Sequence, residues 1–309
     1  MHMNSAWMLR LASGLALFVA TACGGIVVVD HDLGGGEGGA GGFPSGTTGS
    51  GAGTPTSSAS TGGGGPGTGG GLPGEAVPEP IQQRCPDLAA QPVVCVTTAY
   101  KGVAVVSPAT GQHCHLFDFL DGDLQAAWKN SSIGVLGNHL YFPQGERGAA
   151  RISLDLGVIE PATMSRGVTA ITTWQGSLLV RPYDSFESNL ERYATFDDLR
   201  AGSVAEVFQV NNDNLFVFAA SRTSLFSAWH STSFIEREPI PAFDSIATIA
   251  LQNFDGWVDG LWPNDTDGTL IVLSDRILYT FEQTTGAQVG RAPVSSGLGQ
   301  LMGLACWRN

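Results

Sequence analysis

The chain has 309 residues, and its 28 acidic side chains outnumber its 15 basic ones, which gives a formal net charge of −13. This acidic balance argues against a nucleic-acid partner, because nucleic-acid binding needs a basic surface. It also argues against electrostatic docking on anionic lipid. The length alone allows one or two domains.

The N-terminus has the pattern of a signal peptide. Arg10 is followed by an apolar run over residues 11–20, and the small residues Ala20, Thr21 and Ala22 come next. About ten apolar residues are too few to span a membrane as a helix, but they suit the core of a signal peptide. We therefore expect residues 1–22 to be removed on export.

Cys23 follows the small residues directly. The segment at 19–24, Val-Ala-Thr-Ala-Cys-Gly, resembles the lipobox of bacterial lipoproteins. The resemblance implies that Cys23 receives a diacylglycerol and becomes the acylated N-terminus, since two or three acyl chains give stable anchoring. It also implies a location in the bacterial cell envelope, with the outer membrane as the expected site and the membrane as a partner. The alternative is an ordinary secretory signal with a chance cysteine.

Residues 23–78 are predicted to form a disordered tether behind this cysteine. Positions 34–74 contain 20 glycines among 41 residues, and Ser, Thr and Pro fill most of the rest. Such a segment has almost no apolar surface to offset the entropy of ordering it. The folding unit is therefore expected over residues 79–309, which is long enough for one large core.

Short β-rich runs alternate with turn residues from residue 93 onward, and no helical period persists beyond about ten residues. A typical unit is a turn, an apolar run, and a second β-rich run about ten residues later. Several of these second runs end in a glycine turn, at Gly111, Gly157 and Gly286. This punctuation resembles the blades of β-propellers of the quinoprotein-like repeat families. The resemblance implies an all-β propeller, and a β-sandwich is the alternative.

The spacing of the apolar runs predicts the number of blades. Five anchor residues, each placed on the first strand of a blade, are 46, 38, 37 and 55 residues apart: Val94, Leu140, Leu178, Leu215 and Leu270. A four-stranded blade takes about 40–50 residues, so five blades are predicted, with six as the alternative. The apolar tail at 301–307 has no partner strand of its own. We expect it to complete the first blade and close the ring.

Four cysteines fall within the expected domain: Cys85, Cys95, Cys114 and Cys306. An even number in an exported domain predicts two disulfides, for which three connectivities are open. The spacing lacks the paired Cys-x-x-Cys pattern of zinc sites. Ring closure by the tail would bring Cys306 near Cys95, so we favour a bridge from Cys306 to the start of the domain.

The spacing of 55 residues exceeds its neighbours by roughly 15, and we assign the excess to an insertion at 251–268. Trp257 and Trp262 are candidates for stacking on a sugar or a hydrophobic partner, since long loops on a rigid scaffold tend to carry function. Asp265 and Asp267 alternate as in a calcium loop but lack the later Glu of an EF-hand. Calcium is the one cofactor considered, and a plain surface turn is the alternative.

Catalytic motifs are missing from the sequence. There is no Gly-x-Ser-x-Gly segment and no phosphate-cradling glycine loop before a helix. His113 and His115 could share a metal on one strand face, but no third ligand is evident. The leading hypothesis is therefore a non-catalytic binding or scaffold domain, with a glycan or an envelope protein as partner. The alternative is a carbohydrate-active enzyme on a propeller scaffold, which rests on analogy of fold alone.

Overall fold

The structure is a computed structural model, and it describes residues 76–99, 102–119, 132–146, 148–164, 167–183, 189–211, 215–229 and 231–309. The predicted signal peptide, Cys23 and the glycine-rich part of the tether lie outside these residues. Within them, no helix is long and apolar enough to cross a membrane.

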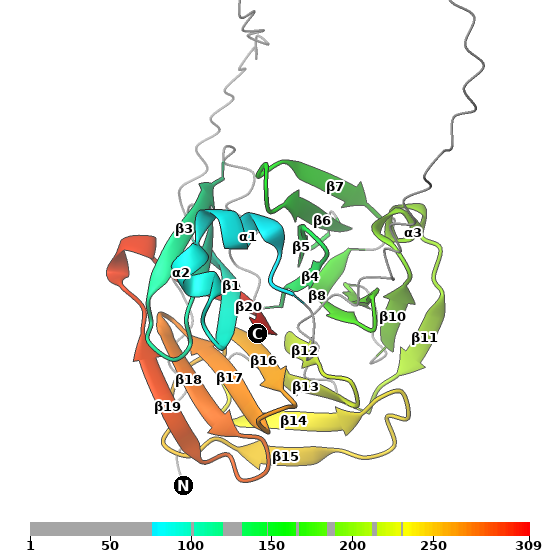
Figure 1. The fold of residues 1–309 in the computed structure, drawn as a ribbon. Coiled ribbons are helices and arrows are strands. Elements are labelled where there is room, and N and C mark those ends of the chain that lie inside the picture. The colour runs from blue at the N-terminus through cyan, green and yellow to red at the C-terminus, as the bar shows by residue number, and fades with distance from the viewer. Residues whose placement is uncertain are drawn as a thin grey trace, which may run out of the picture. The chain divides into compact units, whose positions relative to one another are not determined.

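Five antiparallel sheets of four strands each form a five-bladed β-propeller (Figure 1). From the axis to the rim, blade 1 consists of β20 (Leu301–Arg308), β1 (Val93–Ala99), β2 (Gly102–Val106) and β3 (His113–Asp118). Blade 2 consists of β4 (Gly134–Leu136), β5 (His139–Pro143), β6 (Gly148–Ser153) and β7 (Ile159–Thr163). The predicted fold and the predicted blade number are confirmed.

The other three blades follow the same order. Blade 3 consists of β8 (Val168–Trp174), β9 (Ser177–Pro182), β10 (Asn189–Tyr193) and β11 (Glu206–Gln209). Blade 4 consists of β12 (Val217–Ala220), β13 (Ser224–Ala228), β14 (Phe234–Pro239) and β15 (Ala247–Ala250). Blade 5 consists of β16 (Gly260–Asn264), β17 (Thr269–Ser274), β18 (Ile277–Glu282) and β19 (Gln288–Pro293).

The innermost strands form a closed ring. β20 contacts β16 on one side and β4 on the other, and the ring continues from β4 to β8, β12 and back to β16. β20 also pairs with β1 along its length. The C-terminal strand therefore completes the first blade and closes the propeller, as predicted.

Burial explains why the inner strands look uniformly apolar in the sequence. The innermost strands β12 and β16 are buried at every position, because neighbouring blades cover both faces of these sheets near the axis. The rim strand β11 is exposed at three of its four positions, and the rim strand β19 at three of its six. Continuous apolar runs therefore mark inner strands, whereas polar runs mark the rim.

Two disulfides hold the start and the end of the domain. Cys95 on β1 is bonded to Cys306 on β20, and both are fully buried. This is the favoured bridge, and it is confirmed. Cys85 is bonded to Cys114 on β3, which selects one of the three connectivities that the sequence left open.

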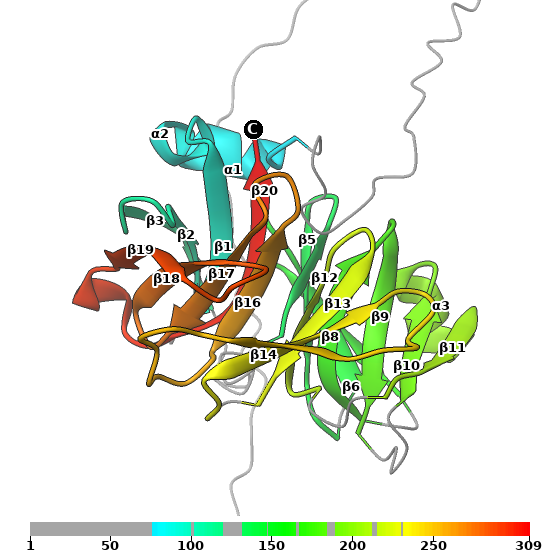
Figure 2. The same ribbon diagram turned by 90° about the horizontal axis from the view of Figure 1, so that it is seen from below.

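Short helices cover one face of the propeller. α1 (Glu79–Arg84) and α2 (Pro86–Ala89) place Ile81 and Leu88 against the core of blades 1 and 2. The amide of Asn309 donates hydrogen bonds to the carbonyls of Ala89 and Gln91. The C-terminus and these helices thus lie together on one face, which we call the cap face (Figure 2). Among the residues that the structure describes, the other helices are α3 (Phe196–Ala201) in blade 3 and a 3₁₀ turn at Ser296–Leu298.

The three predicted glycine turns occupy one equivalent position. Gly111, Gly157 and Gly286 each lie between the third and fourth strands of a blade, with φ between +65° and +71°. In each case the glycine N–H donates to the carbonyl four residues earlier. A Cβ on Gly286 would lie 1.8 Å from the carbonyl oxygen of Ala250 in the neighbouring blade. Glycine is therefore required both by φ and by close contact between blades.

The predicted anchor positions need two corrections. Val94, Leu140, Leu178 and Leu270 lie on the second strand of their blades, because the innermost strands are β20, β4, β8 and β16, respectively. Leu215 precedes β12, so Leu225 on β13 is the true counterpart in blade 4. With Leu225 the spacings become 46, 38, 47 and 45 residues. The prediction of an insertion at 251–268 is therefore wrong. Leu215 was mistaken for a strand residue equivalent to the other anchors, because an inner strand that follows a turn looks like a second strand in sequence.

Candidate functional site

The face opposite the cap face carries exposed aromatic rings. The innermost strands begin on that face, because β20 ends at the cap face and the inner strands run parallel to it. Tyr183 directly follows β9, whose end pairs with the beginning of β8. Trp229 follows β13, whose end pairs with the beginning of β12. Phe216 and Trp257 precede β12 and β16, so we call these four residues the aromatic face.

Three of the four rings are strongly exposed. Trp257 is 62% exposed, Tyr183 53% and Trp229 40%. A single exposed hydrophobic residue needs no explanation. Several large exposed rings on one face, however, are typical of an interaction site. Tyrosine and tryptophan are also enriched at protein contacts.

The centre of the aromatic face is built across the boundary of blades 3 and 4. The rings of Phe216 and Trp229 lie 4.4 Å apart between centroids, at an interplanar angle of 37°. The guanidinium of Arg181 on β9 lies 5.2 Å from the centroid of Phe216, within the range of a cation–π contact. Tyr183 is fixed by a 2.8 Å hydrogen bond from its N–H to the carbonyl of Gly167. The Phe216 and Trp229 rings are therefore held by their neighbours, and the backbone of Tyr183 is fixed by the scaffold.

Only one of the two tryptophans predicted for ligand binding is accessible. Trp257 is exposed on the aromatic face, whereas Trp262 is 5% exposed on β16 and packs in the core between blades 5 and 1. Trp229 and Tyr183 escaped the sequence prediction. Their position directly after a second strand is the signal that could have identified them, once the strand register is known.

The predicted calcium ligands lie in the turn between β16 and β17, on the cap face, and both have protein partners. A carboxylate oxygen of Asp265 accepts the Arg222 N–H at 3.2 Å. Asp267 is paired with the guanidinium of Arg308 at 2.6 Å and accepts the Asn264 amide at 3.0 Å. The described residues contain no group of three or more His, Cys, Asp or Glu side chains able to hold a metal. The calcium site stays a prediction.

The two histidines predicted as a possible metal pair lie within the described part of the chain. His113 and His115 lie on β3, the rim strand of blade 1, and Nε2 of His115 lies 3.0 Å from a carboxylate oxygen of Asp118. His113 lines a different feature, a pocket of about 460 Å³ between α2 and β3. The Cys85–Cys114 disulfide forms part of the wall of this pocket.

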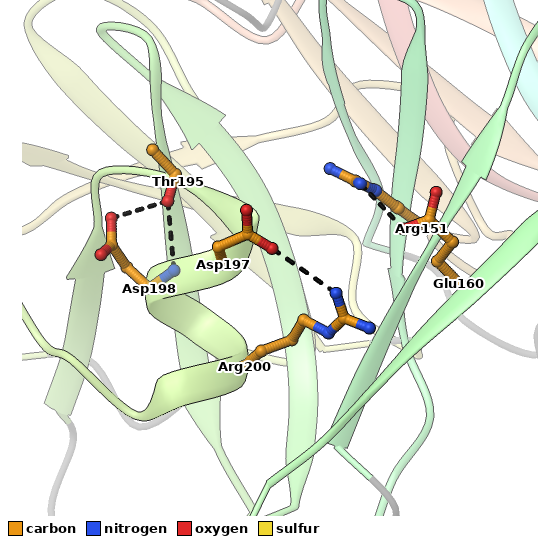
Figure 3. A network of polar contacts seen from close by, with 6 residues as sticks. All are labelled: Arg151, Glu160, Thr195, Asp197, Asp198 and Arg200. Atoms are coloured by element: carbon orange, nitrogen blue, oxygen red, sulfur yellow. Dashed lines mark hydrogen bonds and ion pairs between the residues drawn. The ribbon is translucent and has the colours of Figure 1, made fainter.

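Polar contacts order the two sides of the boundary between α3 and blade 2 (Figure 3). Thr195 caps the helix by accepting the Asp198 N–H at 3.1 Å, and Arg200 pairs with Asp197 at 3.5 Å. Arg151 on β6 donates to Glu160 on β7 at 2.8 Å, and this hydrogen bond lowers the pKa of Glu160. These contacts are those of a structural joint between two blades.

The ring of Phe196 on α3 is the apolar partner in that joint. It lies 4.7 Å from the guanidinium carbon of Arg151 and 5.6 Å from the ring of Tyr141. Burial is the main cause that raises the pKa of Tyr141 and lowers that of His139, which lies on the same strand. The network is therefore packed against the core that contains Tyr141 and Phe196.

Glu238 is a buried carboxylate near the end of β14. Its side chain is 1% exposed, and within the described part of the chain its Oε1 has no hydrogen-bond partner. Oε2 accepts the Asn211 N–H at 3.4 Å. Burial raises the pKa of Glu238 from 4.5 to about 7, and the nearby Glu236 charge adds to that effect.

The inner ring carries little chemistry. As described, the five innermost strands β20, β4, β8, β12 and β16 include no carboxylate and no histidine. Their positions are filled mostly by apolar side chains and by glycines that allow close approach, such as Gly260 against Gly303 and Leu304. These strands therefore offer no acid–base pair toward the axis.

No protein family matches the chain, and no curated protein is similar to it. Among solved structures, glutaminyl cyclase of Myxococcus xanthus is 11% identical, with a TM-score of 0.41 over 55% of this chain and 72% of that one. PorZ, a surface component of the type-IX secretion system of Porphyromonas gingivalis, is 14% identical, with a TM-score of 0.39 over 64% of this chain and 25% of that one. A chain of a nidogen/laminin complex is 9% identical, with a TM-score of 0.43 over 69% of this chain and 98% of that one. At TM-scores below 0.5 these likenesses carry no argument about function.

Proposed function

We propose that this chain is an exported, lipid-anchored module of the bacterial envelope that binds another envelope protein through the aromatic face, without catalysing a reaction. The observation that carries the proposal is the exposure of Tyr183, Trp229 and Trp257 on one face of a rigid propeller. Exposed rings of this size cost free energy in water and release it when a partner covers them.

The residue types on this face favour a protein partner. Tryptophan, tyrosine and arginine are the side chains that most often dominate binding energy at protein contacts. The Phe216–Trp229 pair and the neighbouring Arg181 offer a partner three things: apolar surface to bury, aromatic rings to contact, and a positive charge. A glycan is the alternative ligand, because sugars also cover exposed rings.

The composition of the inner ring supports a binding role over catalysis. An enzyme that uses the central opening needs acid–base groups on the strands that surround it. The inner strands present apolar residues there, which suits a scaffold. Under the alternative that the chain is an enzyme, the catalytic side chains therefore lie outside the five innermost strands.

The anchor is proposed from the sequence alone. Cys23 with the lipobox-like segment before it, and the tether over 23–78, would hold the propeller at a membrane surface while leaving it free to reach a partner. The outer membrane of a bacterial envelope is the proposed location.

Melting curves of the full chain in detergent, recorded with a glycan panel, separate the two ligand classes. A ligand that binds only the folded state stabilises it and so raises the melting temperature. At a ligand concentration one hundred times its Kd, the gain in stability is about 2.7 kcal/mol. The proposal expects no glycan to do so. A glycan that stabilises the wild-type chain but not Trp229→Ala would replace the protein partner with a sugar.

A further inference from the structure

The two disulfides of the propeller differ in their surroundings. Cys95 and Cys306 are 0% and 1% exposed and lie in the core shared by blades 5 and 1. Cys114 is half-buried on the rim strand β3, and both Cys85 and Cys114 line the pocket of about 460 Å³. A reagent that enters this pocket reaches sulfur without unfolding the propeller.

A cation, Arg84, and a carboxylate, Asp87, both line the pocket beside the disulfide. Arg84 lies next to Cys85 in the chain and lines the pocket with it. The guanidinium of Arg84 is held in place, because it donates to the carbonyls of Leu116 and Asp155. A fixed cation stabilises a thiolate that forms nearby. Cys114 is the more accessible sulfur, because Cys85 is 3% exposed whereas Cys114 is half-buried, so attack on Cys114 makes Cys85 the leaving group.

We propose that Cys85–Cys114 is a reversible thiol-exchange site whose substrate class is a dithiol, and that Cys95–Cys306 is excluded from this exchange by burial. The exchange begins when a thiolate of the dithiol attacks Sγ of Cys114. A bond forms between these two sulfurs, the Cys85–Cys114 bond breaks, and Cys85 leaves as a thiolate. Exposed disulfides are generally the labile and regulatory ones.

The second thiol of the reagent completes the step. It attacks the reagent sulfur of the mixed disulfide and releases Cys114 as a thiolate. The reagent is oxidised to a disulfide, the protein bridge is reduced by two electrons, and the two protons of the dithiol end on Cys85 and Cys114. No other reactant is needed.

Reduction changes one connection and leaves the ring intact. The bridge ties the segment that contains α1 and α2 to β3, the rim strand of blade 1. After reduction this segment is still held by buried Ile81 and Leu88. The β1–β20 ladder and its own disulfide continue to close the propeller. The exchange therefore converts a covalent attachment of the N-terminal segment into a non-covalent one.

The test is differential alkylation of the full chain in detergent. The chain is treated with dithiothreitol under native conditions, quenched with iodoacetamide at successive times and analysed by peptide mass spectrometry. We expect Cys85 and Cys114 to be labelled roughly tenfold faster or more than Cys95 and Cys306. The second pair should be labelled fully only after unfolding in guanidinium. Equal rates for the two bridges, or no native labelling of the first, would overturn the proposal.

Two further measurements test the direction of attack and the part played by charge. A monothiol, glutathione, should be trapped by acid as a mixed disulfide on Cys114, and trapping on Cys85 would reverse the assignment. Arg84→Gln should react several-fold more slowly than Arg84→Lys, which loses the same hydrogen-bonding fork but keeps the charge. Equal rates for these variants would remove Arg84 from the proposal.

Discussion

Cys95 and Cys306 stand directly opposite each other on the first and last strands of the domain, with 3.9 Å between their Cα atoms. The disulfide between them closes a loop of 211 residues in sequence separation. It therefore fixes the ring at the point where its two ends meet. A longer closed loop restricts the unfolded chain more strongly.

Replacing both Cys95 and Cys306 by Ala should lower the free energy of unfolding by about 2–5 kcal/mol. Denaturant unfolding of the full chain in detergent measures the loss. The matched control is the Cys85→Ala and Cys114→Ala pair, which opens a separation of only 29 residues and should cost less. A larger loss in the control pair would contradict the assigned closure.

Stability should fall as pH rises through neutrality because of Glu238. Its folded pKa of about 7 lies above the ordinary value of 4.5, so the folded state binds more protons between these values. The stability contributed by the protonated form is fully present below about pH 4.5 and is lost as pH rises through about 7. The shift corresponds to roughly 3 kcal/mol.

Glu238→Gln removes this dependence, because an amide does not titrate. The variant should therefore melt at a higher temperature than wild type at pH 8 and should have a flatter melting profile between pH 5 and pH 8. Glu236→Gln is the control, since it retains the buried carboxyl and should keep most of the slope, reduced only by the loss of the Glu236 charge. Parallel profiles for wild type and Glu238→Gln would count against the buried, titrating carboxyl.

Gly286 should tolerate substitution much less well than Gly268. Both have φ near +65°, but a Cβ at Gly286 meets the Ala250 carbonyl, whereas a Cβ at Gly268 meets nothing within 4 Å. Gly268→Ala should cost about 1 kcal/mol, the conformational penalty alone. Gly286→Ala should cost at least about 2 kcal/mol more, because neighbouring blades must separate. Equal melting temperatures for the two variants would refute the close contact between blades.

Asp267 should stabilise the folded chain through its ion pair with Arg308, and this stabilisation should not depend on calcium. Asp267→Asn should cost about 0.5–1 kcal/mol, since the pair is partly exposed. The cost should be the same in calcium and in EDTA, as measured by melting temperature. A rise in the wild-type melting temperature with calcium that disappears in the variant would establish the predicted calcium site instead.

The propeller fold could be predicted because its blades repeat the same burial pattern and the same turn. The inner strands are buried on both sides and read as apolar runs, and Gly111, Gly157 and Gly286 mark the same turn in three blades. The register of blade 4 was not predictable, because Leu215 before β12 and Leu225 on β13 both follow turn residues. Only pairing between strands distinguishes them.

The candidate site was predictable only in part. Trp257 was found from local composition, and Trp262 was selected with it although it lies in the core. Two tryptophans five residues apart look equivalent until the beginning of β16 is known. Trp229 and Phe216 are 13 residues apart and meet only because β12 and β13 form a hairpin. Their contact is a property of the fold and has no local signature.

Photo-crosslinking in cells tests whether the aromatic face binds an envelope protein. A photoreactive phenylalanine analogue replaces Trp257 on the aromatic face, or Thr266 in the exposed turn on the cap face, in chains that keep Cys23. The account predicts one membrane-fraction adduct with an envelope protein from position 257, none from position 266, and loss of the 257 adduct in Trp229→Ala. Adducts of equal yield from both positions, or none from position 257, would contradict a binding role for this face.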